Sequence, residues 1–225
     1  MTGVQAVRVS RALRIPDAVE RDDLASFVGR AVRLDSAAIV RLRAREDGTV
    51  GAWASTGFDV IAARSVHGEL SPSDTTVKAG ELLTALAVLR TDAVDPGFAI
   101  DAEWREALPP VTGFVHVDDV PSKVVSELVE RGVALAREHG GPNGGPPSSL
   151  LDQEVISVCG ADDQVGVPLR CIFALSGMGF VGEGDDEPVR VRVTRGWLRL
   201  DARYGSILRR RRPQFPLFVV ETHTR

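Results

Sequence analysis

The segment "AAIVRLRAREDGTVGAWAS" at residues 37–55 constrains the fold of this chain more than any other. Every second position from Val40 to Ala44 is apolar, and the positions between them, from Arg41 to Arg45, are arginines. This period of two is typical of a β-strand with one face on a core and one face in water. The Asp-Gly pair at 47–48 predicts a tight hairpin turn, because glycine accepts the positive φ that such turns need. The segment therefore predicts two antiparallel strands with arginines on the outer face.

Helical and extended patterns follow one another along the rest of the chain. Apolar residues recur at helical spacing in four segments, at 21–34, 77–89, 121–139 and 167–180. Extended segments are predicted at 6–13, 58–66, 97–104, 113–119 and 154–160, and a hairpin at 188–211 turns at Arg195-Gly196. This order predicts an α+β fold in which antiparallel sheets carry helices packed on one face.

The two halves of the chain resemble each other. "LLTALAVL" at residues 82–89 aligns with "CIFALSGM" at 171–178, and each precedes a segment that ends in tryptophan, at Trp104 and Trp197. Each half also opens with a strand, a helix and a strand. A chain of 225 residues is long enough for two small domains. We interpret the pattern as an internal duplication, with a first α/β subdomain at 1–110 and a second at 111–225.

Composition indicates the class of protein and its compartment. Hydrophobic residues make up 44% and charged residues 26%, which is typical of a soluble globular protein. Cys159 and Cys171 stand in apolar surroundings, which predicts two buried free thiols. No segment approaches the ~18 apolar residues of a membrane span, and the N-terminal stretch has no apolar run typical of a signal peptide. We expect a cytoplasmic protein without a membrane partner.

Charge is distributed unevenly along the chain. Residues 190–225 contain ten arginines and two acidic residues, a net charge of +8, whereas the rest of the chain carries 17 basic and 29 acidic residues, a net charge of -12. Such asymmetry predicts a basic face on an acidic body. The face would suit an anionic ligand or the acidic part of a second copy of the chain.

The arginine run at 209–212 and its neighbours form the predicted binding face. Guanidinium groups pair bidentately with phosphate and carboxylate oxygens, and an aromatic ring beside them can stack on a base. We expect a homo-oligomer or a complex with an acidic protein surface, and nucleic acid is the alternative partner. The candidate partner- or nucleic-acid-binding residues are Arg190, Arg192, Arg199, Arg203, Tyr204, Arg209, Arg210, Arg211 and Arg212.

No catalytic, metal or cofactor motif stands out. The four histidines share no metal-ligand spacing with a cysteine, and the glycine-rich segment "HGGPNGGPP" lacks the lysine-serine ending of a phosphate-binding loop. We therefore expect a non-enzymatic protein with no metal and no cofactor. An enzyme on a new α+β scaffold is a second alternative, which a cluster of His116, Asp118, Asp119 and Asp152 in a cleft would favour.

Three segments of the second half resemble a family of actinobacterial proteins of unknown function. They are "GPPSSLLDQEV" at 145–155, "VPLRCIFALSGMGF" at 167–180 and "WLRLDARYGSILRRR" at 197–211. The resemblance covers about a third of the chain. It implies a cytosolic actinobacterial protein and brings no activity with it.

Residues 22–86 resemble one domain of a DNA sliding clamp in plan. They run through a helix, the hairpin at 37–55, a further strand and "DTTVKAGELLTAL". With two such units per chain, three chains would be needed to close a ring of six domains. Clamp helices line the ring with basic charge, but the helical segments at 21–34 and 123–139 mix acidic with basic residues. No functional residue is carried over from the clamps.

Overall fold

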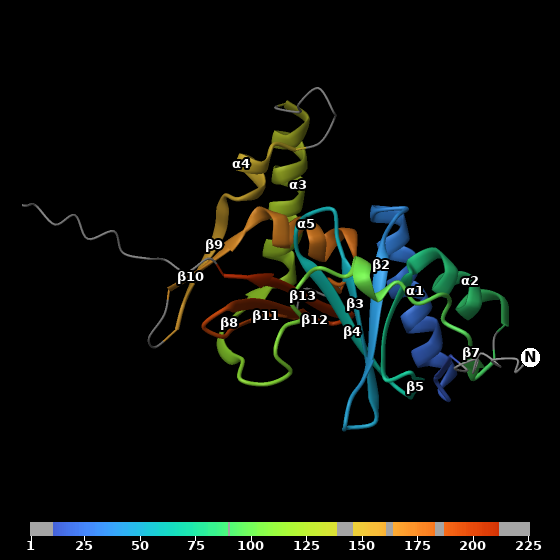
Figure 1. Ribbon diagram of the computed structural model, residues 1–225. Helices are drawn as coiled ribbons and strands as arrows, with labels where there is room; N and C mark the ends of the chain where they lie inside the picture. The colour runs from blue at the N-terminus through green and yellow to red at the C-terminus, as the bar shows by residue number, and fades with distance from the viewer. Residues whose placement is uncertain (1–10, 90, 139–145, 161–163, 183–186, 212–225) are drawn as a thin grey trace, which may run out of the picture.

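The computed structural model describes residues 11–89, 91–138, 146–160, 164–182 and 187–211 (Figure 1). The first half contains β1 (Ala12–Arg14), α1 (Ala18–Leu34), β2 (Ile39–Ala44), β3 (Thr49–Ser55), β4 (Ile61–His67), β5 (Glu69–Ser71), β6 (Asp74–Lys78), α2 (Ala79–Leu89), β7 (Ala93–Val94) and the 3-10 helix η1 (Asp101–Glu103). The second half contains β8 (Val115–Pro121), α3 (Ser122–Glu138), α4 (Ser148–Leu151), β9 (Glu154–Cys159), β10 (Gln164–Pro168), α5 (Leu169–Gly177), β11 (Pro188–Val193), β12 (Trp197–Ala202) and β13 (Gly205–Arg210).

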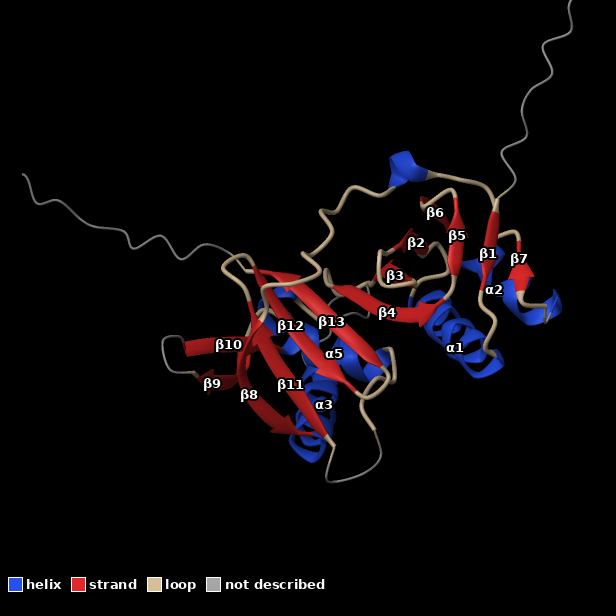
Figure 2. Ribbon diagram, turned by 90° about the horizontal axis from the view of Figure 1, so that it is seen from below, coloured by secondary structure: helices blue, strands red, loops and turns tan. Residues whose placement is uncertain are grey.

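Eight antiparallel strands from both halves form one sheet in the order β6-β2-β3-β4-β13-β12-β11-β8 (Figure 2). The halves join where β4 pairs with β13, with Ala62 opposite Ile207 and Ile61 opposite Leu208. Pairing of these strands removes an exposed edge from each half, with its unpaired N–H and C=O groups. The predicted α+β class with antiparallel sheets is confirmed, but the halves share their main sheet instead of having one each.

Four helices of 9 to 17 residues cover one face of this sheet (Figure 1). α1 packs on α2 over the first four strands, and α3 packs on α5 over the last four. The apolar positions of β2, Val40 and Leu42, lie in one buried core with Leu24 and Phe27 of α1, as the alternation predicts. Two helices on four strands in each half confirm two similar subdomains.

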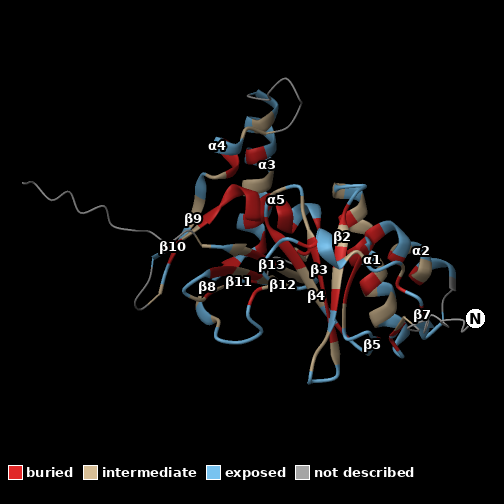
Figure 3. Cartoon of the chain, in the orientation of Figure 1, coloured by how far each residue is buried: buried red, intermediate tan, exposed pale blue. Residues whose placement is uncertain are grey.

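Helix α5 is buried on nearly every side (Figure 3). Every residue of α5 from Leu169 to Leu175 is buried, which confirms the predicted buried helix at 167–180. Gly132 of α3 permits this packing, because a Cβ there would lie 2.8 Å from the Phe173 ring. No described helix is long and apolar enough to cross a membrane.

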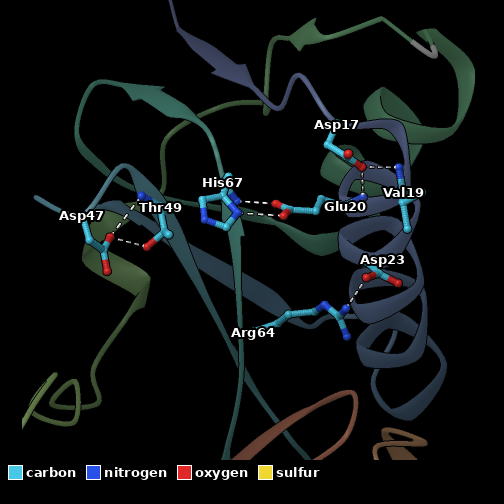
Figure 4. Close-up of polar contacts among 8 residues, drawn as sticks. All are labelled: Asp17, Val19, Glu20, Asp23, Asp47, Thr49, Arg64 and His67. Carbon is cyan, nitrogen blue, oxygen red and sulfur yellow. Dashed lines mark hydrogen bonds and ion pairs between the residues drawn. The ribbon is translucent and has the colours of Figure 1, made fainter.

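Polar contacts attach α1 to strand β4 of the sheet (Figure 4). The Asp17 side chain caps the helix by accepting hydrogen bonds from the amides of Val19 and Glu20. Glu20 accepts a hydrogen bond from the His67 backbone amide and lies 2.7 Å from His67 Nδ1, while Asp23 pairs with Arg64 of β4. These contacts fix α1 along β4, the strand that joins the halves by pairing with β13.

A second, smaller core lies on the opposite face of the sheet, which we call the outer face. It contains Trp53, Ile61, Trp197 and Leu208 from the strands, and Trp104 from the connection at 95–114. The predicted strand at 97–104 is wrong, since this segment contains only η1 and otherwise runs without strand pairing. The connection is held by burial of Trp104 and by hydrogen bonds to Thr76 of β6, from the Ile100 amide to its carbonyl and from its amide to the Asp101 carboxylate.

The cysteine prediction is half right. Cys171 is buried in α5, but Cys159 at the end of β9 is exposed, because β9 and β10 form a separate two-stranded hairpin instead of joining the main sheet. Burial raises the pKa of the Cys171 thiol to about 12.

We expect iodoacetamide to label Cys159 in the folded protein and Cys171 only after unfolding, as measured by peptide mass spectrometry. Equal labelling of both thiols without denaturant would contradict this burial pattern.

Candidate binding grooves beside the outer face of the sheet

Arginines of the outer face are paired with acidic neighbours. Asp201 lies 2.6 Å from Arg199 and 3.5 Å from Arg192, and Asp119 lies 3.4 Å from Arg190. The three arginines project from β11 and β12 on the side opposite the helices, as the alternation predicts. The centre of this face is therefore an ion-pair network in which much of the predicted positive charge is locally offset.

The turn between β12 and β13 carries two further predicted residues. Arg203 pairs with Glu187 and lies over the Tyr204 ring, with its guanidinium carbon 5.5 Å from the ring centre. Tyr204 remains exposed. These two side chains border a groove described below.

The arginine run does not form one patch. Arg209 points to the helix side and binds Asp152 at 2.8 Å, whereas Arg210 lies over the Trp197 ring on the outer side, 5.8 Å from the ring centre. Arg211 donates to the Thr194 carbonyl at 3.1 Å, and Arg212 lies outside the described residues. Successive side chains of a strand point to opposite faces, so the pleat divides the run.

The three described residues of the run nevertheless meet at one groove, which we call the strand-end groove. It forms where β4 and β12 begin and β13 ends, and encloses about 1530 Å³. Its walls are formed by Asp152, Glu154 and residues of five segments, at 59–61, 105–107, 164–168, 195–198 and 208–211. The connection at 105–107 and the turn at 195–196 thus bring two more arginines, Arg105 and Arg195, to the residues of the run.

Charge in the strand-end groove is mixed, with a positive excess. The arginines are Arg105, Arg195, Arg209, Arg210 and Arg211. The acidic residues are Asp59, Glu106, Asp152 and Glu154. Ile61, Trp197 and Leu208 add apolar surface between them.

Asp152 is the most heavily engaged acid of the groove. Its carboxylate accepts hydrogen bonds from Arg209 and from the buried Arg170, whose guanidinium also donates to the Phe58 carbonyl at 2.8 Å and lies 3.5 Å from Asp59. Partial burial alone would raise the pKa of Asp152, but the two guanidinium groups outweigh it, and the pKa is lowered. Asp152 therefore serves the fold, and it also holds Arg209, whose side chain is only 18% exposed.

A second groove of about 320 Å³ lies on the outer face and is called here the Trp53 groove. Trp53, Arg45 and Arg199 lie along it, and Tyr204 and the connection at 109–111 form its rim. It unites the predicted Arg199, Arg203 and Tyr204 with Arg45, which the sequence alone did not single out. Alternation and turn signals locate Arg45 and Arg195 in the sequence, but long-range folding decides which groove these two residues and Arg105 reach.

The residues of the enzyme alternative do not gather. His116 and Asp119 lie on β8 with 3.0 Å between Nε2 and a carboxylate oxygen, but Asp152 follows α4 and binds Arg170. Within the described ranges, no group of three histidine, cysteine or acidic side chains is arranged to hold a metal ion. The part of the glycine-rich segment up to residue 145 lies outside them.

Two family models match the chain, and both are of unknown function. Residues 9–106 match the Domain of unknown function (DUF8010), and residues 109–214 match the Domain of unknown function (DUF8185). No curated protein matches the sequence. Between them the two models span most of the chain and meet inside the connection at 95–114.

The fold is similar to that of bacterial sliding clamps. The DNA polymerase sliding clamp of Bacillus subtilis superposes with a TM-score of 0.58 at 13% identity, covering 92% of this chain and 66% of the clamp. The Caulobacter crescentus pol III beta superposes with a TM-score of 0.55 at 13% identity, covering 88% of this chain and 64% of that protein. The chain thus spans slightly less than two thirds of the length of these clamps, and the similarity concerns the fold.

Proposed function

We propose that this chain, which combines two domains of unknown function in a clamp-like fold, is a non-enzymatic scaffold. It binds an acidic segment of a partner protein in the strand-end groove. The observation that carries the proposal is the convergence of five arginines from three separate segments on that one groove. Clustered guanidinium groups are a common means of recognising acidic peptide segments.

The helix face is a poor surface for a polyanion. α1, α2, α3 and α5 together carry seven basic and seven acidic side chains. Duplex binding depends on an excess of basic side chains that contact phosphates, which this neutral layer does not offer. We therefore place the partner at the groove and not along the helices.

Acidic residues of the groove favour a peptide over a nucleic acid. Asp59, Glu106 and Glu154 stand among the arginines and would repel the regular phosphates of a nucleic-acid strand. A peptide can place carboxylates opposite arginines and apolar side chains against Trp197 and Leu208. The partner segment is accordingly acidic with apolar residues interspersed, from a second copy of the chain or from another protein.

The test is selection from a random peptide library on the full chain, with counter-selection on an Arg195→Glu/Arg210→Glu variant. We expect enrichment of peptides that combine acidic with apolar residues. Anisotropy of a labelled selected peptide should show at least a tenfold weaker Kd for this variant, since two charge-assisted contacts become repulsive. An Arg43→Glu/Arg190→Glu variant makes the same charge change outside the groove and should bind as wild type does.

Two outcomes would overturn the peptide proposal. Enriched peptides without acidic residues, or equal loss in both double variants, would remove the groove as the recognition site. Labelled single-stranded and duplex DNA serve as a second probe in a salt series. Binding that falls with a log-log slope of about -3 to -4 and is lost in the Arg195→Glu/Arg210→Glu variant would establish nucleic acid as the ligand instead.

A further inference from the structure

We propose that the Trp53 groove is a binding site for a small organic anion, with Arg45 as its principal cationic contact. The ligand class is a phosphate or carboxylate attached to a flat apolar body. This site is separate from the strand-end groove and does not depend on the function proposed for it. The argument rests on an unsatisfied cation, on the composition of the groove and on the packing behind it.

Arg45 is the unsatisfied cation. Its Nε is buried and lacks a hydrogen-bond partner among the described residues, and no described carboxylate lies within ion-pair distance of it. Buried charged donors are ordinarily paired, because burial removes their water. Burial lowers the pKa of Arg45, with Asp47 opposing the shift and Arg199 adding to it. A bound anion would offset the repulsion between Arg45 and Arg199 and balance the charge of the Arg45 guanidinium.

The composition of the groove suits an anion. Among the described residues that line it are four arginines, and none of them is acidic. Three of these arginines already have carboxylate partners outside the groove: Arg64 pairs with Asp23, Arg199 with Asp201 and Arg203 with Glu187. Arg45 therefore leaves an unbalanced positive charge there. Ser65 adds a hydroxyl donor, whereas the Ser206 hydroxyl already donates to Asp201. A volume of about 320 Å³ fits a ligand of one ring and one anionic group.

Packing behind Arg45 holds its guanidinium in place. The group lies over the Trp53 indole, 5.2 Å from the ring centre. Gly51 makes room for the pair, since a Cβ there would lie 2.4 Å from the Trp53 ring and 3.0 Å from an Arg45 nitrogen. Pro109, Pro110 and Val111 of the connection supply apolar surface at the rim, against which a flat apolar body can lie.

The experiment is isothermal titration calorimetry of the full chain with four probes. Phenyl phosphate and phenylacetate carry both a ring and an anion, inorganic phosphate carries only the anion, and phenol carries only the ring. We expect a ring-bearing anion to bind with a Kd near or below about 1 mM. Its affinity should be at least tenfold higher than that of inorganic phosphate and that of phenol. The two ring-bearing anions distinguish a phosphate site from a carboxylate site.

Arg45→Gln is the decisive variant, and Arg43→Gln is its control. Arg43 lies two residues earlier on the same face, outside the groove, and is exposed. We expect at least a tenfold loss of binding for Arg45→Gln, unchanged binding for Arg43→Gln, and no fall in the thermal midpoint of ligand-free Arg45→Gln. Absence of binding by both ring-bearing anions up to about 10 mM would overturn the proposal. So would undiminished binding in Arg45→Gln, or a lowered ligand-free midpoint, which would make Arg45 a structural residue.

Discussion

Replacing Asp152 by alanine is expected to lower the free energy of unfolding by about 3 kcal/mol, at the lower end of the range for breaking a buried ion pair. The loss follows from Arg170, whose side chain is only 7% exposed and lies 2.9 Å from Asp152. Without that carboxylate, the buried guanidinium keeps, among the described residues, the Phe58 carbonyl and the exposed Asp59 at 3.5 Å. Thermal unfolding should occur about 6–12 °C lower, as scanning calorimetry would measure.

The effect of this substitution should depend on pH. The pKa of Asp152 is lowered in the folded protein, so its charge stabilises the fold above its unfolded pKa of about 4 and ceases to do so as pH falls through the folded value. The difference between wild type and Asp152→Ala should therefore be full at neutral pH and shrink below about pH 4. A difference that stays constant down to pH 2 would contradict the pairing.

Asp59→Asn is the matched control for Asp152→Ala, because asparagine removes the charge and still accepts the φ of 58° at this position. Both carboxylates face the same guanidinium, but the Asp59 side chain is 85% exposed and 3.5 Å away. Exposed pairs contribute little, so we expect a change of less than about 0.5 kcal/mol. Equal losses in the two variants would show that burial of Arg170 is not what makes the contact matter.

Trp104→Ala is expected to lower the free energy of unfolding by about 3–4 kcal/mol and to release the connection at 95–114 from the sheet. Trp104 is 8% exposed, packs in the outer core with Trp53 and Trp197, and donates its indole N–H to the Glu106 carbonyl at 2.7 Å. The connection supplies a wall of both grooves. Trypsin should cut after Arg105 faster in this variant, as mass spectrometry of the fragments would show.

Phe98→Ala is the control for Trp104→Ala on the same connection. The Phe98 side chain is 71% exposed. Among the ring contacts of the described residues, Phe98 has one, with the guanidinium carbon of Arg11 4.9 Å from its ring centre. We expect a loss below about 1 kcal/mol and unchanged cleavage after Arg105. Cleavage that is equally fast in wild type and in Trp104→Ala would mean that the connection is not held by its tryptophan.

Local sequence patterns predicted an element correctly where the residues that determine its structure are close together in the sequence. The hairpin at 37–55 and the helix at 167–180 follow from periodicity and from the Asp-Gly and glycine signals, and both are found. The segment at 97–104 shows the limit. Its apolar residues suggested a strand, but Trp104 is buried by side chains of β3 and β12, which lie far away in the sequence.

The candidate grooves show the same difference between what local patterns predict and what long-range contacts decide. Arginine alternation on β11 and β12 predicts which side Arg190 and Arg192 face, and this is confirmed. Acidic residues on other elements, such as Asp119 on β8 and Asp152 after α4, decide which arginines remain available to bind a ligand.

The sequence by itself determined the α+β class, the two similar halves and the excess of arginine near the end of the chain, because these depend on periodicity and composition. Only the tertiary structure joined β4 to β13, divided the arginine run between two faces and left Arg45 without a described carboxylate, because strand pairing and ion pairing depend on residues that folding brings together from distant positions.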